Sequence, residues 1–294
     1  MAPQPRDPRL WDYWRRVCVE GALVMSSARE SDAWARRFYS APDGPLRFEV
    51  WQPPVNSLAA RRFDELEKDG SIVAFVRPQD THKGADSLTG LDPRLFRGRT
   101  LNLVCGREAP AAFKNAIARR LAETQNARVA FHLRINDQHK FRLIAAAQAV
   151  LFPSRFEGYG YPPVEAAYSG AESVVFDLPV LRESVGRVAH FAPTPDLAGF
   201  ESAMAAALAQ PERRAELRQA VFEIADFPRC ALRLADILLR SGEAIGPLPH
   251  RSFRALLGPF PDTAPSPPQD RHAPPTPFPA YVVNAVETTG GDLL

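Results

Sequence analysis

The sequence has few cysteines and no long hydrophobic run. Its three cysteines, Cys18, Cys105 and Cys230, lie far apart, which supplies neither a zinc-binding quartet nor a disulfide framework and suits a reducing compartment. No segment approaches the roughly 18 apolar residues that span a bilayer, and the first residues lack the apolar core of a secretory signal. We therefore expect a cytoplasmic protein.

The chain also lacks an excess of either charge. Its 36 lysines and arginines nearly balance 34 aspartates and glutamates, so the formal net charge is +2. A domain built to coat phosphate backbones needs a clear basic excess, so nucleic acid is not an expected partner. Because 45% of the 294 residues are hydrophobic, the chain has enough apolar surface for a folded core.

Proline is abundant but unevenly placed. Eleven of the 29 prolines lie between Ile245 and Ala280, a density that excludes helices and interrupts strands. We expect the folded domain to end near Gly242. Residues 243–294 then form a Pro-rich tail that lies on the surface, links to another domain or binds a partner domain.

Upstream of the tail, apolar runs typical of strands alternate with segments of helical periodicity. This alternation predicts a Rossmann-like α/β fold, in which a doubly wound parallel sheet is covered by helices on both faces. The expected strands cover residues 18–25, 47–51, 71–76, 101–105, 129–133, 149–153 and 172–176. The expected helices cover residues 28–39, 109–124, 137–148, 163–169, 195–209, 211–224 and 228–240.

A proline-containing segment at residues 52–56 interrupts the alternation. We interpret it as a crossing between domains. The sequence therefore predicts a short N-terminal remnant with this crossing over residues 1–56, and one complete doubly wound domain over residues 57–242.

The segment 152–167 holds the densest set of candidate functional residues. It follows an expected strand and opens an expected helix, where open parallel sheets bind their ligands. Gly158 and Gly160 let the backbone approach a ligand closely. Pro162 and Pro163 can preset the first helical turn, whose free N–H groups and positive dipole end favour an anion.

Two carboxylates flank this glycine loop. Glu157 precedes the glycines and Glu165 lies on the expected helix, so the pair can accept hydrogen bonds from hydroxyl groups on either side of a bound anion. The pattern indicates a sugar joined to a nucleoside through a diphosphate. The alternative is that both are solvated surface charges, as most glutamates are.

An ordered series of motifs extends from this loop in both directions. Residues 157–165, with the sequence EGYGYPPVE, resemble the E-x7-E signature of retaining, GT-B-fold glycosyltransferases of family 4, the glycosyl transferases group 1. Upstream, Arg77 and Lys83 resemble the basic pair of that family, although their spacing is one residue longer than usual. Downstream, residues 179–186 resemble its P-x-L-x-E-x-x-G segment, and the resemblance covers roughly residues 15–240.

The resemblance implies how the reacting part of the donor is held. Glu157 is expected to reach hydroxyl groups of the transferred sugar. Arg77 and Lys83 are expected to neutralise the diphosphate and so stabilise the leaving group. Two cations and a helix end make a metal ion unnecessary, so neither a metal nor a cofactor is expected.

The resemblance also implies which residues hold the rest of the donor. Glu165 is expected to bind the ribose hydroxyls, and Leu133 to line the base pocket through its main chain. The backbone amides of Gly158, Tyr159 and Gly160 are expected to hold sugar or phosphate. The donor is then a UDP- or GDP-sugar.

Family members bind the acceptor in an N-terminal half that this chain largely lacks. One hypothesis is a retaining, metal-independent glycosyltransferase with an unknown acceptor, whose acceptor lobe is reduced or lies in another chain. The other is a non-catalytic module that binds a nucleotide-sugar. Leu23, Val24 and Trp34 lie on the face that the missing lobe would cover, so we expect them to be partly exposed unless the tail or a partner shields them. A homo- or hetero-oligomer is one such partner.

Overall fold

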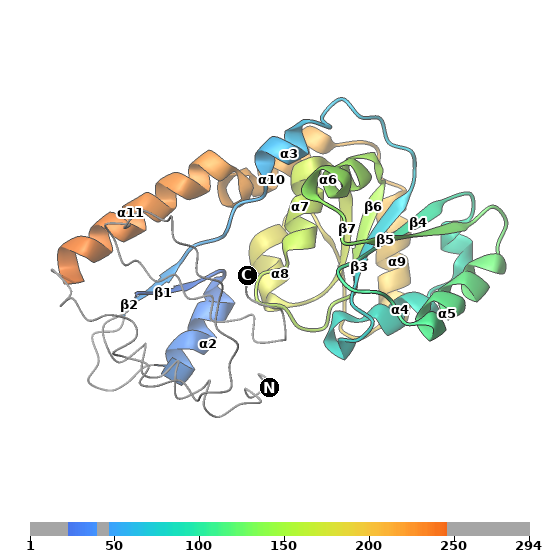
Figure 1. The fold of residues 1–294 in the computed structure, drawn as a ribbon, viewed down its shortest axis with the longest axis horizontal. Helices are drawn as coiled ribbons and strands as arrows, with labels where there is room; N and C mark the ends of the chain where they lie inside the picture. The colour runs from blue at the N-terminus through green and yellow to red at the C-terminus, as the bar shows by residue number, and fades with distance from the viewer. Residues whose placement is uncertain (1–22, 40–46, 246–294) are drawn as a thin grey trace, which may run out of the picture. The chain divides into compact units, whose positions relative to one another are not determined.

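The computed structural model describes residues 23–39 and 47–245, so Cys18 and the predicted tail from residue 246 lie outside the described residues (Figure 1). The contacts within the chain divide it into two compact units. Among the described residues, Ser27–Ser31 and Trp51–Arg233 form the larger unit, and the remainder forms the smaller one.

The smaller unit contains a parallel pair of strands, β1 (Leu23–Ser26) and β2 (Arg47–Val50). Helix α2 (Arg29–Tyr39) connects them in sequence, as predicted. The last helix that the structure describes, α11 (Phe227–Ile245), continues three residues beyond the predicted domain end. Val24 is only 2% exposed. Val24 is therefore shielded within the chain, whereas Leu23 and Trp34 are partly exposed, as expected.

The larger unit is built on a six-stranded parallel sheet, which confirms the predicted doubly wound fold. Numbered along the chain within this sheet, the strands lie in the order 3-2-1-4-5-6, so the order reverses between β3 and β6. In space the strands are β5 (Arg128–Leu133), β4 (Thr100–Cys105), β3 (Ile72–Val76), β6 (Ala149–Phe152), β7 (Glu172–Phe176) and β8 (His190–Ala192).

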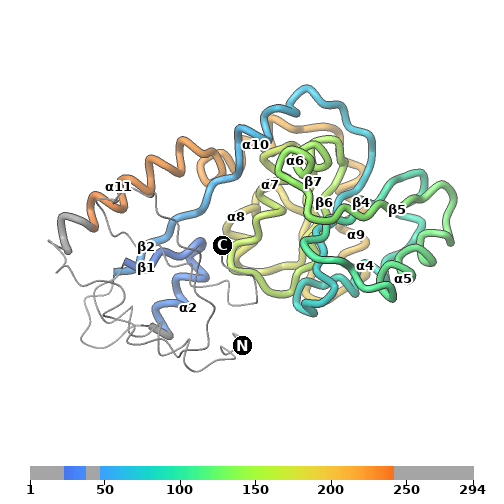
Figure 2. Tube along the Cα trace, in the orientation of Figure 1, coloured from blue at the N-terminus to red at the C-terminus, as the bar shows by residue number. Residues whose placement is uncertain are grey.

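Helices cover both faces of this sheet, and the chain returns from β5 at one edge to β6 beside β3 (Figure 2). One face carries α3 (Ser57–Arg61), α6 (Asp137–Ala146), α7 (Tyr161–Ser169), α8 (Pro179–Val185) and α10 (Arg214–Ala225). The other carries α4 (Ala85–Gly90), α5 (Ala111–Ala122) and α9 (Leu197–Leu208), with short 3-10 turns at Thr81–Lys83 and Pro93–Phe96.

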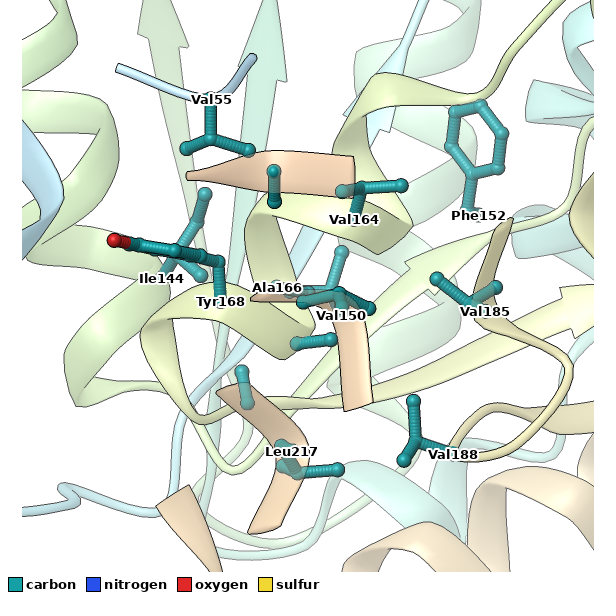
Figure 3. Close-up of a cluster of buried hydrophobic side chains, with 14 of the residues drawn as sticks. Val55, Ile144, Val150, Phe152, Val164, Ala166, Tyr168, Val185, Val188 and Leu217 are labelled. Atoms are coloured by element: carbon teal, nitrogen blue, oxygen red, sulfur yellow. The ribbon is translucent and has the colours of Figure 1, made fainter. Parts of the chain in front are cut away.

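Strand β3 shows why an unbroken apolar run forms the centre of such a sheet. Successive side chains of a strand point to opposite faces. Val73 accordingly packs into the cluster under α6 and α7, whereas Ile72 and Ala74 pack into the cluster under α5 and α9. Figure 3 shows part of the first cluster, including Val150 of β6 and Val164 of α7.

Several short elements were not predicted. Strand β8 has three residues and helices α3, α4 and α8 have five to seven, which is too few to show a clear apolar period. The described helices include none that is both long and apolar enough to span a bilayer. Cys105 and Cys230 are free and buried, and burial raises the pKa of Cys230 to about 11, which makes its thiol unreactive.

Candidate active site

The loops that follow β3 and β6 touch at the point where the strand order reverses. The Arg155 N–H donates to the His82 carbonyl at 2.7 Å. Gly84 has a φ of +66°, and a Cβ there would lie 1.8 Å from the Pro153 carbonyl oxygen. Only glycine fits this position, so Gly84, directly after Lys83, lets the two loops meet.

This contact brings together two of the residues singled out from the sequence. The Lys83 Nζ lies 2.8 Å from the Glu157 Oε1, and the two side chains are 23% and 9% exposed. The second carboxylate oxygen of Glu157 accepts no hydrogen bond from the described residues, yet it is not sealed from solvent. The pair therefore offers one open carboxylate oxygen beside a cation.

Glu165 forms a second lysine–glutamate pair. It lies on α7, is 7% exposed, and accepts a hydrogen bond of 2.7 Å from Lys140 of α6. Burial disfavours the ammonium of Lys140, but the charges of Glu165 and Asp137 outweigh this and hold its pKa above the usual range. Sequence reasoning missed Lys140, because a lone lysine on an amphipathic helix carries no motif.

Two serines that were not predicted fix the peptide that joins Gly158 to Tyr159. The hydroxyl groups of Ser31 and Ser27 donate to the Gly158 carbonyl at 2.7 and 3.3 Å. Among the described peptides only that between Thr194 and Pro195 is cis, so the peptide after Gly158 is trans. The Tyr159 N–H therefore points away from the serines.

Tyr159 and Gly160 lie where the chain turns into α7. Tyr159 is 5% exposed, and its hydroxyl has no partner among the described residues, while burial raises its pKa. Gly160 has a φ of +83°, and a Cβ there would lie 2.3 Å from a methyl group of Leu181. Gly160 thus serves the turn and its packing.

The start of α7 differs from the prediction. The helix begins at Tyr161 with Gly160 as its N-cap, two residues earlier than expected. Pro162 and Pro163 therefore lie inside the first turn. Because proline has no N–H, two of the first three residues of α7 cannot donate to an anion, which weakens the predicted anion site at this helix end.

Arg77 and Leu133 lie on the same edge of the sheet. Neither forms a hydrogen bond or ion pair with a residue of the two lysine–glutamate pairs. The Arg77 Nε lies 3.0 Å from the Asp80 Oδ2, and its side chain is 35% exposed. Its ion-pair partner is thus Asp80 and neither signature glutamate. Leu133 ends β5 and is 42% exposed, so the end of that strand is open to solvent.

A hollow of about 290 Å³ lies beside the loop after β3. None of Lys83, Glu157 and Glu165 lines it, so the two lysine–glutamate pairs lie outside this hollow. Its lining residues are Pro78, Asp80, Thr81, Ala85, Asp86 and Arg155.

Together these contacts define a Rossmann-like α/β protein with a polar site where open sheets of this order bind ligands. Two buried carboxylates each present one open oxygen, which suits hydroxyl groups, and the Lys83 ammonium suits phosphate. Residues 58–223, more than half of the chain, match the family described as Glycosyl transferases group 1. The chain belongs to this family, as its motifs predicted.

Solved structures show the same fold at low sequence identity. Sucrose-phosphate synthase from Thermosynechococcus elongatus is 20% identical with a TM-score of 0.66, and the match covers 83% of this chain and 65% of the synthase. A glycosyltransferase from Rickettsia africae ESF-5 is 12% identical with a TM-score of 0.62, covering 81% of this chain and 68% of that one.

A third solved structure has a smaller share of its length in common with this chain. The pneumococcal O-GlcNAc transferase GtfA is 16% identical with a TM-score of 0.60, and the match covers 79% of this chain and 48% of the transferase. No curated protein sequence matches the chain. This chain thus shares the Rossmann-like architecture of GT-B proteins but spans about two thirds or less of each of these three proteins.

Proposed function

We propose that this chain transfers a hexosyl group from a nucleotide-diphosphate sugar to an acceptor, with retention and without a metal ion. The observation that carries the proposal is the contact of 2.8 Å between Lys83 and Glu157 where the β3 and β6 loops meet. Membership of the glycosyl transferases group 1 supports the same reaction class.

The cations at this edge supply the charge stabilisation that the reaction needs. As the glycosidic bond breaks, negative charge grows on the leaving diphosphate, and the fixed ammonium of Lys83 stabilises it. Glu157 holds hydroxyl groups of the sugar through its open oxygen. Arg77 is 35% exposed, so it can turn from Asp80 to the diphosphate as a second cation.

The remaining contacts of the donor fall to the neighbouring residues. Glu165 accepts the ribose hydroxyls, and the main chain of Leu133 lines the base. The amides of Gly158, Tyr159 and Gly160 hold sugar or phosphate. The serine contacts to the Gly158 carbonyl support this role, because they turn the Tyr159 N–H away from themselves.

The solved structure of GtfA is a complex with UDP and GlcNAc, so UDP and UDP-sugars are the first donors to test and GDP-sugars the second.

The small size of the unit that would bind the acceptor supports a second function, which is binding of the donor without transfer. The described residues of the smaller unit contain a sheet of two strands only. A homo- or hetero-oligomer would complete the acceptor side.

The test uses the full chain. Calorimetric titration with UDP and GDP measures binding, and release of nucleoside diphosphate from UDP- and GDP-sugars measures turnover. The proposal predicts both, with Glu157→Gln retaining diphosphate binding but losing turnover. Binding without turnover in the unmodified chain selects the second function, and no binding of either diphosphate at millimolar concentration rejects both.

Lys83→Met tests the diphosphate contact. We expect it to weaken UDP binding roughly 10- to 100-fold and to leave uridine binding unchanged, because a charge-assisted contact to phosphate is lost. Lys114→Met is the matched control, since Lys114 of α5 pairs with Glu108 of the preceding loop and with neither signature glutamate. Equal losses for UDP and uridine would contradict the role of Lys83.

Metal removal and product analysis test the two finer parts of the proposal. Turnover is expected to persist unchanged in EDTA, because the protein cations act in place of a metal. The anomeric configuration of the transferred sugar, measured by NMR, is expected to equal that of the donor. Loss of turnover in EDTA that Mg²⁺ or Mn²⁺ restores contradicts metal independence, and an inverted product contradicts retention.

A further inference from the structure

Lys140 is the one member of the two lysine–glutamate pairs that no sequence motif contains. Its Nζ donates to Glu165 Oε1 at 2.7 Å and lies 2.9 Å from Asp137 Oδ1. Its side chain is 20% exposed, and the ammonium also lies 4.6 Å from the centre of the Phe141 ring. The cation is therefore held from several sides.

The partners of Lys140 are themselves anchored. Asn56 donates to the other carboxylate oxygen of Asp137 at 2.8 Å, and Asn56 also caps α3 by accepting from the Ala59 N–H. A chain of contacts thus runs from the start of α3 through Asp137 and Lys140 to Glu165. Lys140 cannot move without breaking one of these contacts.

The two oxygens of Glu165 have different surroundings. Oε1 is occupied by Lys140. Oε2 accepts no hydrogen bond from the described residues, but it is not among the side-chain atoms that are sealed from solvent without a partner. The contact with Lys140 therefore occupies one oxygen of a 7% exposed carboxylate and leaves the other, Oε2, open.

The charge state of Glu165 matters for what it can bind. An isolated carboxylate that is buried to this degree tends to take up a proton. A protonated carboxyl group has one donor and reduced acceptor capacity, whereas a carboxylate accepts from two neighbouring hydroxyl groups. Burial raises the pKa of Glu165, and the adjacent ammonium of Lys140 opposes this rise and so favours the ionised carboxylate.

We propose that Lys140 is a positioning residue for donor recognition, which holds Glu165 in place so that its open oxygen accepts the ribose hydroxyls. This inference rests on the proposed function, since it requires that the site holds a nucleotide. Lys140 of α6, which lies outside every recognised motif, then helps the site to select ribonucleotides over analogues that lack the ribose hydroxyls.

The experiment compares UDP, or GDP if that binds better, with its 2′,3′-dideoxy analogue. In the unmodified chain the dideoxy analogue is expected to bind roughly 10- to 100-fold more weakly, because the charged acceptor loses its hydroxyl partners. Lys140→Met is expected to weaken binding of the ribonucleotide by a similar factor and to weaken binding of the dideoxy analogue less than about threefold. Lys114→Met is expected to change neither.

Two further variants keep the test informative if Lys140→Met folds poorly. Lys140→Arg retains a cation and is expected to recover much of the preference for the ribonucleotide. Lys140→Met/Glu165→Met removes both charges. Replacing both members of a buried ion pair by apolar side chains commonly leaves the stability of the fold unchanged or increases it. It is expected to fold but to bind both diphosphates with equal affinity.

The outcomes separate this inference from the proposed function. If the unmodified chain binds no nucleoside diphosphate, the proposed function fails first. If it prefers the ribonucleotide and Lys140→Met retains that preference, or loses both ligands equally while remaining folded, Lys140 has no positioning role and the proposed function stands.

Discussion

The Lys83 ammonium and the Glu157 carboxylate lie 2.8 Å apart although 74 positions separate them in the chain. They meet because β3 and β6 are hydrogen-bonded neighbours, so the loops leaving the two strands share one edge of the sheet. The backbone contact between Arg155 and His82 holds these loops together. The arrangement of the site therefore depends on how closely the two loops approach.

Gly84→Ala tests that approach. The new Cβ would lie 1.8 Å from the Pro153 carbonyl oxygen, and φ at this position is +66°. We expect a loss of about 2–4 kcal/mol in the free energy of unfolding, because the loops must separate and the backbone is strained. Urea unfolding measures the change, and UDP binding is expected to weaken as well.

Gly98→Ala is the matched control for that substitution. Gly98 also has a positive φ, +71°, but a Cβ there meets no atom within 4 Å. We expect a loss of about 1 kcal/mol, from backbone strain alone. Equal losses for the two variants would show that the close approach of the loops contributes nothing to stability.

Ser31→Ala tests the contact that orients the Gly158 peptide. The hydrogen bond of 2.7 Å is lost, and the 3.3 Å contact from Ser27 remains. We expect the free energy of unfolding to fall by about 1 kcal/mol and UDP-sugar binding to weaken several-fold, with uridine unaffected. Ser31→Thr keeps a hydroxyl group and is expected to restore binding.

Ser202→Ala serves as the control for Ser31→Ala. The Ser202 hydroxyl donates to the Ala198 carbonyl within its own helix, α9, and has no part in the site. Donor binding by this variant is expected to match that of the unmodified chain. If Ser31→Ala also binds UDP-sugars normally, the serine does not position the loop.

Asp64→Asn tests the response of the fold to acid. Hydrogen bonds from Arg218, one of them 2.9 Å, hold the pKa of Asp64 below its ordinary value of 3.8. The ionised carboxylate therefore stabilises the folded state above that ordinary value, and the contribution is lost as pH falls through the lower folded value. We expect the substitution to cost about 1 kcal/mol at pH 7.

The pH dependence distinguishes this carboxylate from a general effect of the substitution. The stability difference between the unmodified chain and Asp64→Asn is expected to shrink below about pH 4. Unfolding free energies measured from pH 3 to pH 7 give that difference directly. A difference that stays constant across this range would mean that the ion pair with Arg218 is not its source.

Two buried tyrosines are expected to respond oppositely to loss of their hydroxyl groups. The Tyr168 hydroxyl donates to Asp226 at 2.8 Å and accepts from Arg61 at 3.1 Å, so Tyr168→Phe is expected to cost about 1–3 kcal/mol. The Tyr159 hydroxyl has no partner among the described residues, so Tyr159→Phe is expected to be neutral or stabilising. Thermal unfolding of both variants provides the comparison, and a large loss for Tyr159→Phe would reveal a partner.

The sequence predicted the fold well wherever the elements were long. Apolar strands alternating with amphipathic helices left only a parallel sheet covered on both faces, since neither element can bury its apolar side alone. The three-residue strand β8 was missed because a tripeptide has no measurable period. The early start of α7 at Tyr161 was missed because two consecutive prolines were read as its boundary.

The sequence by itself determined the longer elements, their order and the two signature glutamates, since these follow from local periodicity and from a contiguous motif. Only the tertiary structure decided which cation meets which carboxylate. Lys140 reaches Glu165 across two packed helices, and Ser31 reaches Gly158 from a segment 127 positions away. Such contacts depend on how strands are ordered in space, which local sequence does not encode.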